Sequence, residues 1–254
     1  MELAKLTWKE IENLPRNAIF FLTIGPMEAH GPHLPVSTDF EIAKRVEKEA
    51  MKLMEEENFT CVSMPPLPVG SCHSLQGFAG TISTEWKNLY ALIHNSINSM
   101  VEHGFKYFVI VNFHMDMVHL RGIYKAMKDL KKRGAIIVEP LSPCYFNGIL
   151  FEDIKGEVHA DMKETSLALY LFPEYVREYN LKDFRVKFNI LNSMKKFKDL
   201  GAENAYIGSP SKASPEYGKR AFERMVKCCV EGAKGLYEGK IMELPGKIKF
   251  LLKI

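Results

Sequence analysis

The chain has 254 residues, of which 46% are hydrophobic and 26% are charged, so it can bury a full core and we expect one domain over residues 1–254. The net charge is only +3, and lysines alternate with glutamates along the predicted helices, a pattern typical of solvated helix faces and not of a nucleic-acid-binding surface. No apolar run approaches ~20 residues, which argues against a membrane span, and the N-terminal residues lack the apolar core of a signal peptide.

The first apolar run leads into a loop that concentrates polar side chains. A capping-box spacing at Thr7–Glu10 predicts a short helix ending near Pro15, and residues 18–24 read as a buried strand. Residues 25–39 contain three prolines and two glycines, which argues against a helix or a regular strand there. They carry Glu28, His30, His33 and Asp39. Oxygen and imidazole ligands beyond a strand end suit a divalent cation such as zinc, although a polar surface loop with incidental histidines would look similar.

Helices and strands then alternate along the chain. The predicted elements are a helix at 38–56, a strand at 60–64, a helix from about 84 to 103, a strand at 107–112, a helix ending near 132 and a strand at 135–140. A long loop after the second strand carries Cys72 and His73, and the third strand ends in His114, Met115 and Asp116. Long ordered loops in compact domains are often functional.

The alternation predicts an α/β fold, a three-layer sandwich in which helices flank both faces of a mostly parallel sheet. In such sheets the ligand site lies beyond the carboxyl ends of the strands. The polar clusters around His30 and around His114 both follow strand ends. We therefore expect them to meet at one edge of the sheet, which strengthens the metal hypothesis.

The C-terminal part is less regular. Residues 141–156 show no clear period, whereas His159 and Glu164 straddle the start of a predicted helix that runs to about 171. Residues 175–215 read as a long excursion with a strand near 186–190, followed by a final helix at 216–238. The apolar tail at 248–252 needs a cover, which a neighbouring subunit could supply.

The five cysteines, an odd number, fit a reducing cytoplasm better than a disulfide scaffold. Cys228 and Cys229 lie together on the predicted final helix, where we interpret them as packing residues and not as ligands. No general base stands beside Cys72 in the sequence to mark it as a reactive thiol.

Four segments stand out when they are taken in order. They are Gly25–Pro35 with Thr38–Asp39, Phe78–Ile82, Asn112–His114, and His159–Ala160 with Glu164–Ser166. Together they resemble the creatininase family of metal-dependent hydrolases, over roughly residues 5 to 172 and in the family's order. The first motif is specific, and the others support it.

The resemblance implies two adjacent divalent metal ions per chain, zinc in the first place and manganese or iron as alternatives, within a homohexamer. By motif position, Glu28 and His114 would hold one metal. His30 and Glu164 would hold the other. Asp39 would bridge them, because the two oxygens of a carboxylate can span metals about 3.5–4 Å apart.

The resemblance also implies proton-transfer roles. Asp116 matches a glutamate that handles a proton in creatininase itself, although its side chain is one methylene shorter. His159 matches the histidine that transfers a proton near the leaving group. Asp116 could instead serve only as the N-cap of the following helix, and Asp39 could likewise be a cap, a ligand or both.

The specificity positions depart from the family pattern. Cys72 stands where a serine is common, and Met115 stands where many relatives have glycine. Lys155–Gly156 replaces the Trp-Asp pair that binds creatinine, so creatinine is not the expected substrate. We take Cys72, His73 and Met115 as candidate substrate-binding residues.

We therefore expect a cytoplasmic amidohydrolase that cleaves a C–N bond of a small polar metabolite, in a cyclic amide or an N-acyl group, without nucleic acid or membrane partners. Asp116 would take a proton from the attacking water, and His159 would protonate the leaving atom. Two alternatives keep the metal site: hydrolysis of a C–C bond in a cyclic ketone of the keto-inositol type, and deformylation of a formylaminopyrimidine ribotide. A third is a metal-stabilised oligomer that binds a small metabolite without turnover.

Overall fold

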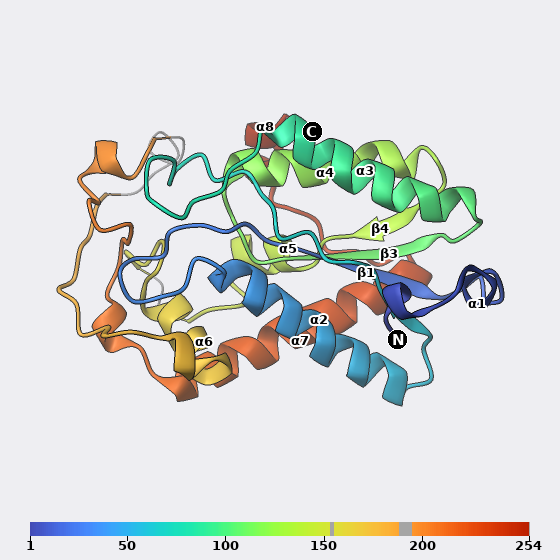
Figure 1. Cartoon of the computed structure of the whole chain (residues 1–254), viewed down its shortest axis with the longest axis horizontal. Coiled ribbons are helices and arrows are strands. Elements are labelled where there is room, and N and C mark those ends of the chain that lie inside the picture. Colours follow the sequence, from blue (N-terminus) through green and yellow to red (C-terminus); the bar gives the residue numbers. More distant parts are fainter. Residues whose placement is uncertain (153–154, 188–194, 254) are drawn as a thin grey trace.

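The strands form a parallel sheet at the centre of the molecule (Figure 1). The structure, a computed structural model, describes residues 1–152, 155–187 and 195–253. Within these residues the strands are β1 (Ile19–Ile24), β2 (Cys61–Ser63), β3 (Tyr107–Asn112) and β4 (Ile136–Val138), in the spatial order β2-β1-β3-β4. β1 pairs with β3 over its whole length, and Ile24 lies opposite Asn112. The carboxyl ends of the two central strands therefore coincide.

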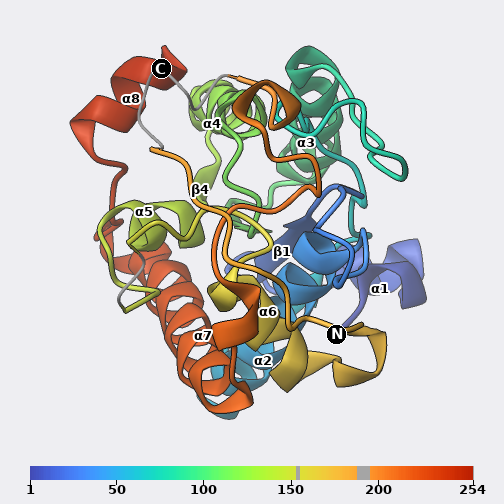
Figure 2. The same ribbon diagram turned by 90° about the vertical axis from the view of Figure 1, so that its left-hand side faces the viewer.

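Side chains that alternate along β1 divide the core into two layers. On one side are α2 (Thr38–Glu56) and α7 (Pro215–Glu238), and on the other are α3 (Trp86–Glu102) and α4 (Met117–Lys131). Ile19 and Phe21 pack toward the first pair of helices, whereas Phe20 and Leu22 pack toward the second. Helices thus cover both faces of the sheet, which confirms the three-layer prediction (Figures 1 and 2).

Shorter helices complete the described part of the chain. They are η1 (Leu3–Lys5), α1 (Trp8–Glu12), α5 (Leu141–Phe146), α6 (Met162–Leu171), η2 (Pro173–Tyr175), η3 (Lys198–Leu200), η4 (Pro210–Lys212) and α8 (Gly246–Leu252). Thr7 and Glu10 form the capping box predicted for α1. Among the described residues, no helix combines the length and the apolar character that crossing a membrane requires.

Helix α5 lies in a stretch that was expected to be irregular. The Glu139 carboxylate accepts hydrogen bonds from Leu141 N and Ser142 N, both 3.1 Å away, and so satisfies free N–H groups at the start of the helix. Pro143 lies in the first turn, where its missing N–H costs little. Two prolines within four residues had hidden this helix in the sequence.

Other boundaries differ from expectation in smaller ways. α3 begins at Trp86 with Glu85 as its N-cap, two residues or so later than predicted. The strand expected near 186–190 falls largely on residues 188–190, which lie outside the described residues, and 186–187 are not in a strand. The apolar tail forms α8 and packs against the α3–α4 layer of its own chain, where Leu252 is buried, although Phe250 stays exposed. Leu252 therefore needs no cover from a second subunit.

A disulfide joins α5 to α7. Cys144 and Cys228 are bonded, with their Cα atoms 6.7 Å apart, and Cys61, Cys72 and Cys229 are buried free thiols. Cys228, interpreted from the sequence as a packing residue, is therefore part of a covalent cross-link. No signal in the sequence indicates this bond, because the two cysteines are separated by 84 residues.

The first turns of α7 lie directly against α6. Gly218 faces the main chain of α6, and a Cβ atom built on it would lie 1.9 Å from Ser166 O. Ser214 N donates to Ser166 Oγ at 3.0 Å, which fastens the same end of α7 to α6. Close backbone packing of this kind requires glycine.

Replacing Gly218 by alanine should destabilise the protein. Alanine in a helix normally gains about 1 kcal/mol over glycine. Here the new methyl group would overlap a backbone carbonyl that cannot rotate away, and overpacking typically costs about 1–3 kcal/mol or more. We expect urea unfolding of Gly218→Ala to show a net loss of stability, whereas the matched Gly246→Ala change, into open space, should be neutral or stabilising. Equal midpoints for the two variants would contradict the close approach.

Candidate metal centre

The loop between β1 and α2 folds back so that its polar side chains converge. Gly25 lets the end of β1 approach the first turn of α2, since a Cβ atom there would lie 2.7 Å from Phe40 Cα. Glu28 N donates to Val36 O at 2.8 Å and closes the loop. Glu28 and His30 are thereby brought beside the N-terminal end of α2, and all of these polar side chains are buried.

Asp39 lies at the middle of the cluster. It belongs to the first turn of α2 and is 2% exposed, and the N-cap of that helix is Ser37. Asp39 Oδ1 is 3.3 Å from His30 Nε2, and Asp39 Oδ2 is 3.0 Å from His114 Nδ1. Each carboxylate oxygen therefore faces a different imidazole, as a bridging ligand requires.

Main-chain carbonyl groups orient both imidazoles. His30 Nδ1 lies 2.9 Å from Glu28 O, and His114 Nε2 lies 3.1 Å from Ser71 O. With these nitrogens as donors to the carbonyl groups, His30 Nε2 and His114 Nδ1 are the ring atoms that face the carboxylates and would bind a metal. This division of the two ring nitrogens is usual for histidines that bind metals.

Glu164 enters the cluster from the start of α6. Asp161 caps that helix and accepts hydrogen bonds from Lys163 N at 2.8 Å and Glu164 N at 3.2 Å. Glu164 Oε2 is 3.8 Å from His30 Nε2 and 3.8 Å from His159 Nδ1. The other nitrogen of His159 lies 2.9 Å from Ala29 O. His159 is thus within reach of a metal as well as of a substrate.

The donors form two groups that meet at Asp39. The first contains Glu28, Cys72 and His114, and the second contains His30, His159 and Glu164, with the donor atoms of each group within 4.8 Å of one another. Within the described residues, Glu28 Oε2, His30 Nε2 and Asp39 Oδ2 are buried and have no hydrogen-bond partner. Such atoms are costly unless something pairs with them. The donor set fits two divalent cations such as zinc, manganese or iron.

The charges of the cluster also favour cations. Burial lowers the pKa of His30, but Asp39, Glu164 and Glu28 outweigh it and raise that pKa to about 10. The pKa of His114 is likewise raised well above its usual value, because Glu28 and Asp39 outweigh the effect of burial. Burial raises the pKa of Glu28. Burial and the neighbouring Asp161 raise the pKa of Glu164 to about 8. The carboxylates thus attract positive charge to the nitrogen atoms that face them.

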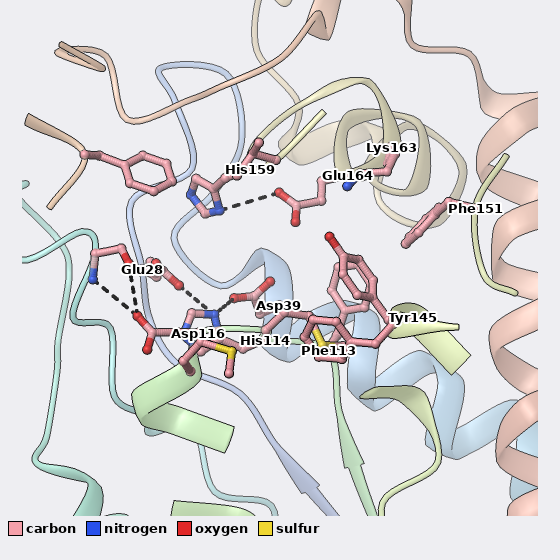
Figure 3. A pocket seen from close by; sticks show the side chains of 16 residues that line it. Glu28, Asp39, Phe113, His114, Asp116, Tyr145, Phe151, His159, Lys163 and Glu164 are labelled. Atoms are coloured by element: carbon pink, nitrogen blue, oxygen red, sulfur yellow. Dashed lines mark hydrogen bonds and ion pairs between the residues drawn. The ribbon is translucent and has the colours of Figure 1, made fainter. Parts of the chain in front are cut away.

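A cavity of ≈ 170 Å³ opens beside these residues (Figure 3). Its polar side consists of Glu28, Asp39, Ser74, His114, Asp116, His159 and Glu164, together with Lys163. Its other walls are apolar or aromatic and consist of Phe113, Met115, Met117, Tyr145, Phe146, Phe151, Val158 and Phe197. The Lys163 ammonium is buried and pairs with Asp161 at 3.1 Å. The cavity can therefore hold an apolar group next to a polar reacting centre.

Asp116 lines this cavity and also caps a helix. Its Oδ1 accepts from Val118 N at 2.7 Å at the start of α4, and its Oδ2 accepts from the main-chain N and the hydroxyl of Ser74, both at 3.3 Å. The cap role is therefore present in the structure, and the role in proton transfer stays a prediction.

The structure separates the three candidate substrate-binding residues. Met115 lines the cavity, whereas Cys72 and His73 are not among the lining residues. Cys72 is fully buried beside Glu28 and His114, and burial raises the pKa of its thiol to about 12. It is therefore no ready nucleophile.

Several cavity residues were missed by sequence reasoning. Tyr145 and Phe146 lie on α5, in the stretch that showed no period, and Phe197 lies in the excursion after α6. Lys163 stands next to the candidate ligand Glu164, and that proximity was a usable signal. His33, the other histidine of the polar loop, lies with its Nε2 2.9 Å from Thr165 Oγ1, one residue beyond Glu164.

Sequence comparison finds a family and several curated relatives. The family model for creatininase, described as creatinine amidohydrolase, matches residues 4–232. A protein from Mycobacterium ulcerans (strain Agy99), named mycofactocin precursor peptide peptidase, is 30% identical over 217 residues, which cover 82% of each chain. A protein of the same name from Mycobacterium tuberculosis (strain ATCC 25618 / H37Rv) is 29% identical over 223 residues, again with 82% of each chain covered.

Solved structures share the fold. A protein from Bacteroides fragilis NCTC 9343, named as a creatinine amidohydrolase, superposes with a TM-score of 0.72 at 21% identity, covering 96% of this chain and 98% of the other. A creatininase superposes with a TM-score of 0.68 at 23% identity, covering 93% and 97%. Other superposed creatininases are described as a manganese form and as a Zn–Zn type. The creatininase-like α/β fold is thereby confirmed.

Proposed function

Because this chain belongs to the creatininase family of hydrolases, we propose that it is a binuclear metal-dependent amidohydrolase that cleaves the C–N bond of an amide. The observation that carries the proposal is the position of Asp39, whose two oxygens face His30 and His114 separately. Glu28 adds a carboxylate beside His114, and Glu164 adds one beside His30. Five side chains in this arrangement suit two cations that share one carboxylate.

Different residues would carry out different steps of the proposed reaction. When bound, the two cations would lower the pKa of water and polarise the amide carbonyl. Asp116 would take a proton from the attacking water, since it lies on the same cavity. His159 lines the same cavity beside Glu164 and would pass a proton to the leaving nitrogen. Without bound cations, burial and the charge of His30 lower the pKa of His159.

The substrate we propose is an amide that carries an apolar group, and a peptide is the foremost candidate. Two observations support it: curated relatives that are 29–30% identical to this chain are named mycofactocin precursor peptide peptidase, and the apolar side of the cavity is mainly aromatic. Lys155 and Gly156, which replace the creatinine-binding pair, do not line this cavity. N-acyl compounds and cyclic amides remain within the same proposal, because they share the C–N bond.

A substrate panel with metal analysis tests the proposal. We expect about two divalent ions per chain and hydrolysis of peptide or N-acyl amides, with creatinine the poorest substrate and chelator-treated protein inactive until a metal is restored. Turnover that is best with creatinine would refute the substrate class. Cleavage of cyclic ketones alone, or of a formylaminopyrimidine ribotide alone, would favour those alternatives. Tight metabolite binding without turnover would favour a binding protein.

A homohexamer in the cytoplasm is the corresponding proposal for assembly and location. It rests on the family resemblance. The cysteines do not support the cytoplasmic location, because Cys144 and Cys228 form a disulfide while three others stay as free thiols. The apolar tail at 248–252 is not an argument for the homohexamer, because α8 buries Leu252 within its own chain.

A further inference from the structure

The two proposed metal positions differ in their third donor. Beside Glu28 and His114 lies the sulfur of Cys72, whereas beside His30 and Glu164 lies the imidazole of His159. We propose that Cys72 binds the metal at the Glu28–His114 position through its sulfur and makes that position selective for zinc over manganese. This inference rests on the proposed binuclear centre and adds a ligand that the family motifs do not contain.

The backbone around Cys72 is held firmly in place. Ser71 N lies 3.2 Å from His119 Nδ1, and Ser71 O accepts the hydrogen bond that orients His114. Cys72 N donates to Ser83 Oγ at 2.9 Å. The same short segment therefore orients the imidazole and positions the sulfur. Groups held in this way need little rearrangement to bind a metal.

Two buried carboxylate oxygens lie beside the same ring nitrogen of His114. Glu28 Oε2 lies 2.9 Å and Asp39 Oδ2 lies 3.0 Å from His114 Nδ1. Both oxygens face this single ring nitrogen, apart from which neither has a hydrogen-bond partner among the described residues, and only 2% of each residue is exposed. With the sulfur, they make a set of two oxygens, one nitrogen and one sulfur. Four donors of these kinds match the tetrahedral coordination that zinc prefers, at about 2.0–2.3 Å from the ion.

The chemistry of sulfur makes the two positions unequal. Cysteine sulfur is a soft ligand that favours zinc, whereas manganese prefers oxygen donors. The His30–Glu164 position offers only nitrogen and oxygen and so should discriminate less between the two metals. Coordination would release the thiol proton to solvent as the metal binds. Cys72 does not line the cavity, and its sulfur lies within 4.8 Å of donor atoms of Glu28 and His114, so it would contact the metal and not the substrate.

Cobalt spectroscopy tests the ligand directly. The purified protein is freed of metal and loaded with Co²⁺, whose visible bands report occupancy and whose near-ultraviolet sulfur-to-cobalt band reports a thiolate ligand. We expect both signals in the wild type. Cys72→Ser should keep the visible bands and lose the near-ultraviolet band, whereas Cys61→Ser, a buried free thiol outside the two donor groups, should keep both.

Competition between metals supplies a second readout. Loss of the sulfur should weaken zinc binding at one of the two positions by roughly 100-fold and change manganese binding by less than about 10-fold. Visible cobalt bands without a sulfur band in the wild type, or a sulfur band that survives in Cys72→Ser, would overturn the inference while the binuclear centre stands. Failure of the wild type to bind cobalt at all would overturn the proposed centre itself. Circular dichroism of Cys72→Ser shows whether the variant is folded.

Discussion

Replacing Asp39 by alanine should remove both metal ions from the folded protein and abolish turnover. Asp39 gives one oxygen to the side of His30 and the other to the side of His114, so each position loses a ligand at once. Deleting a single proton-transfer group typically costs about 10²–10⁴-fold in rate, and losing both cations should cost more than the upper end of that range. Metal analysis of the purified variant, followed by kcat/KM on the best amide substrate, measures both effects.

Two further variants make the Asp39 result interpretable. Asp39→Asn keeps the size of the side chain but removes its charge, and it should also lose metal. Asp129→Ala removes a carboxylate of α4 that pairs with Lys125 and with Lys132, the C-cap of that helix, and it should retain both ions. Asp39 also pairs with the buried imidazoles of His30 and His114, so both Asp39 variants should lose some stability, and thermal unfolding shows that the metal-free variants are folded before their metal content is compared. A folded Asp39→Ala protein that keeps two ions would falsify the bridge.

The second large effect concerns proton transfer. His159→Gln and Asp116→Asn should each lower kcat by about 10²–10⁴-fold while both ions remain bound. Asparagine can still cap α4 at position 116, so stability should change little, although an amide takes up no proton at neutral pH. Metal content, urea unfolding and steady-state kinetics of the two variants separate these effects.

Each outcome assigns a role. Normal turnover by Asp116→Asn would leave Asp116 as the cap of α4 and the anchor of Ser74, as the structure already shows it. Loss of one ion from His159→Gln would make His159 a third ligand beside His30 and Glu164, a role that its position also permits. Full activity of both variants would refute the two proton-transfer assignments and leave the metal centre untouched.

The meeting of the two polar clusters could be predicted because it follows from strand geometry. β1 and β3 are adjacent and parallel, so the loop after Ile24 and the residues after Asn112 must emerge together. The position of Glu164 could not be derived in this way, since α6 reaches the centre through tertiary packing alone. Only the family resemblance placed it there.

Other features carried no local signal. The helix α5 was hidden by its prolines, although Glu139 caps it well. The burial of Cys72 could not be predicted, because it depends on tertiary contacts such as the hydrogen bond from Ser71 N to His119 on α4, and on the way the loop folds back so that Cys72 N donates to Ser83 Oγ. The disulfide likewise joins residues whose proximity exists only in the folded chain.

The contact of Gly218 with Ser166 affects how much of the chain is needed to form the proposed metal centre. Every proposed ligand precedes residue 165, so a fragment truncated before α7 would contain the complete coordination set. It would lack the backbone surface against which the helix carrying Glu164 rests. Such a fragment should bind the second ion poorly, and grafting the centre onto another scaffold would require α7 to be transplanted with it. The smallest part of the chain that could form the centre on its own must therefore include α7 as well as the segments that carry the proposed ligands.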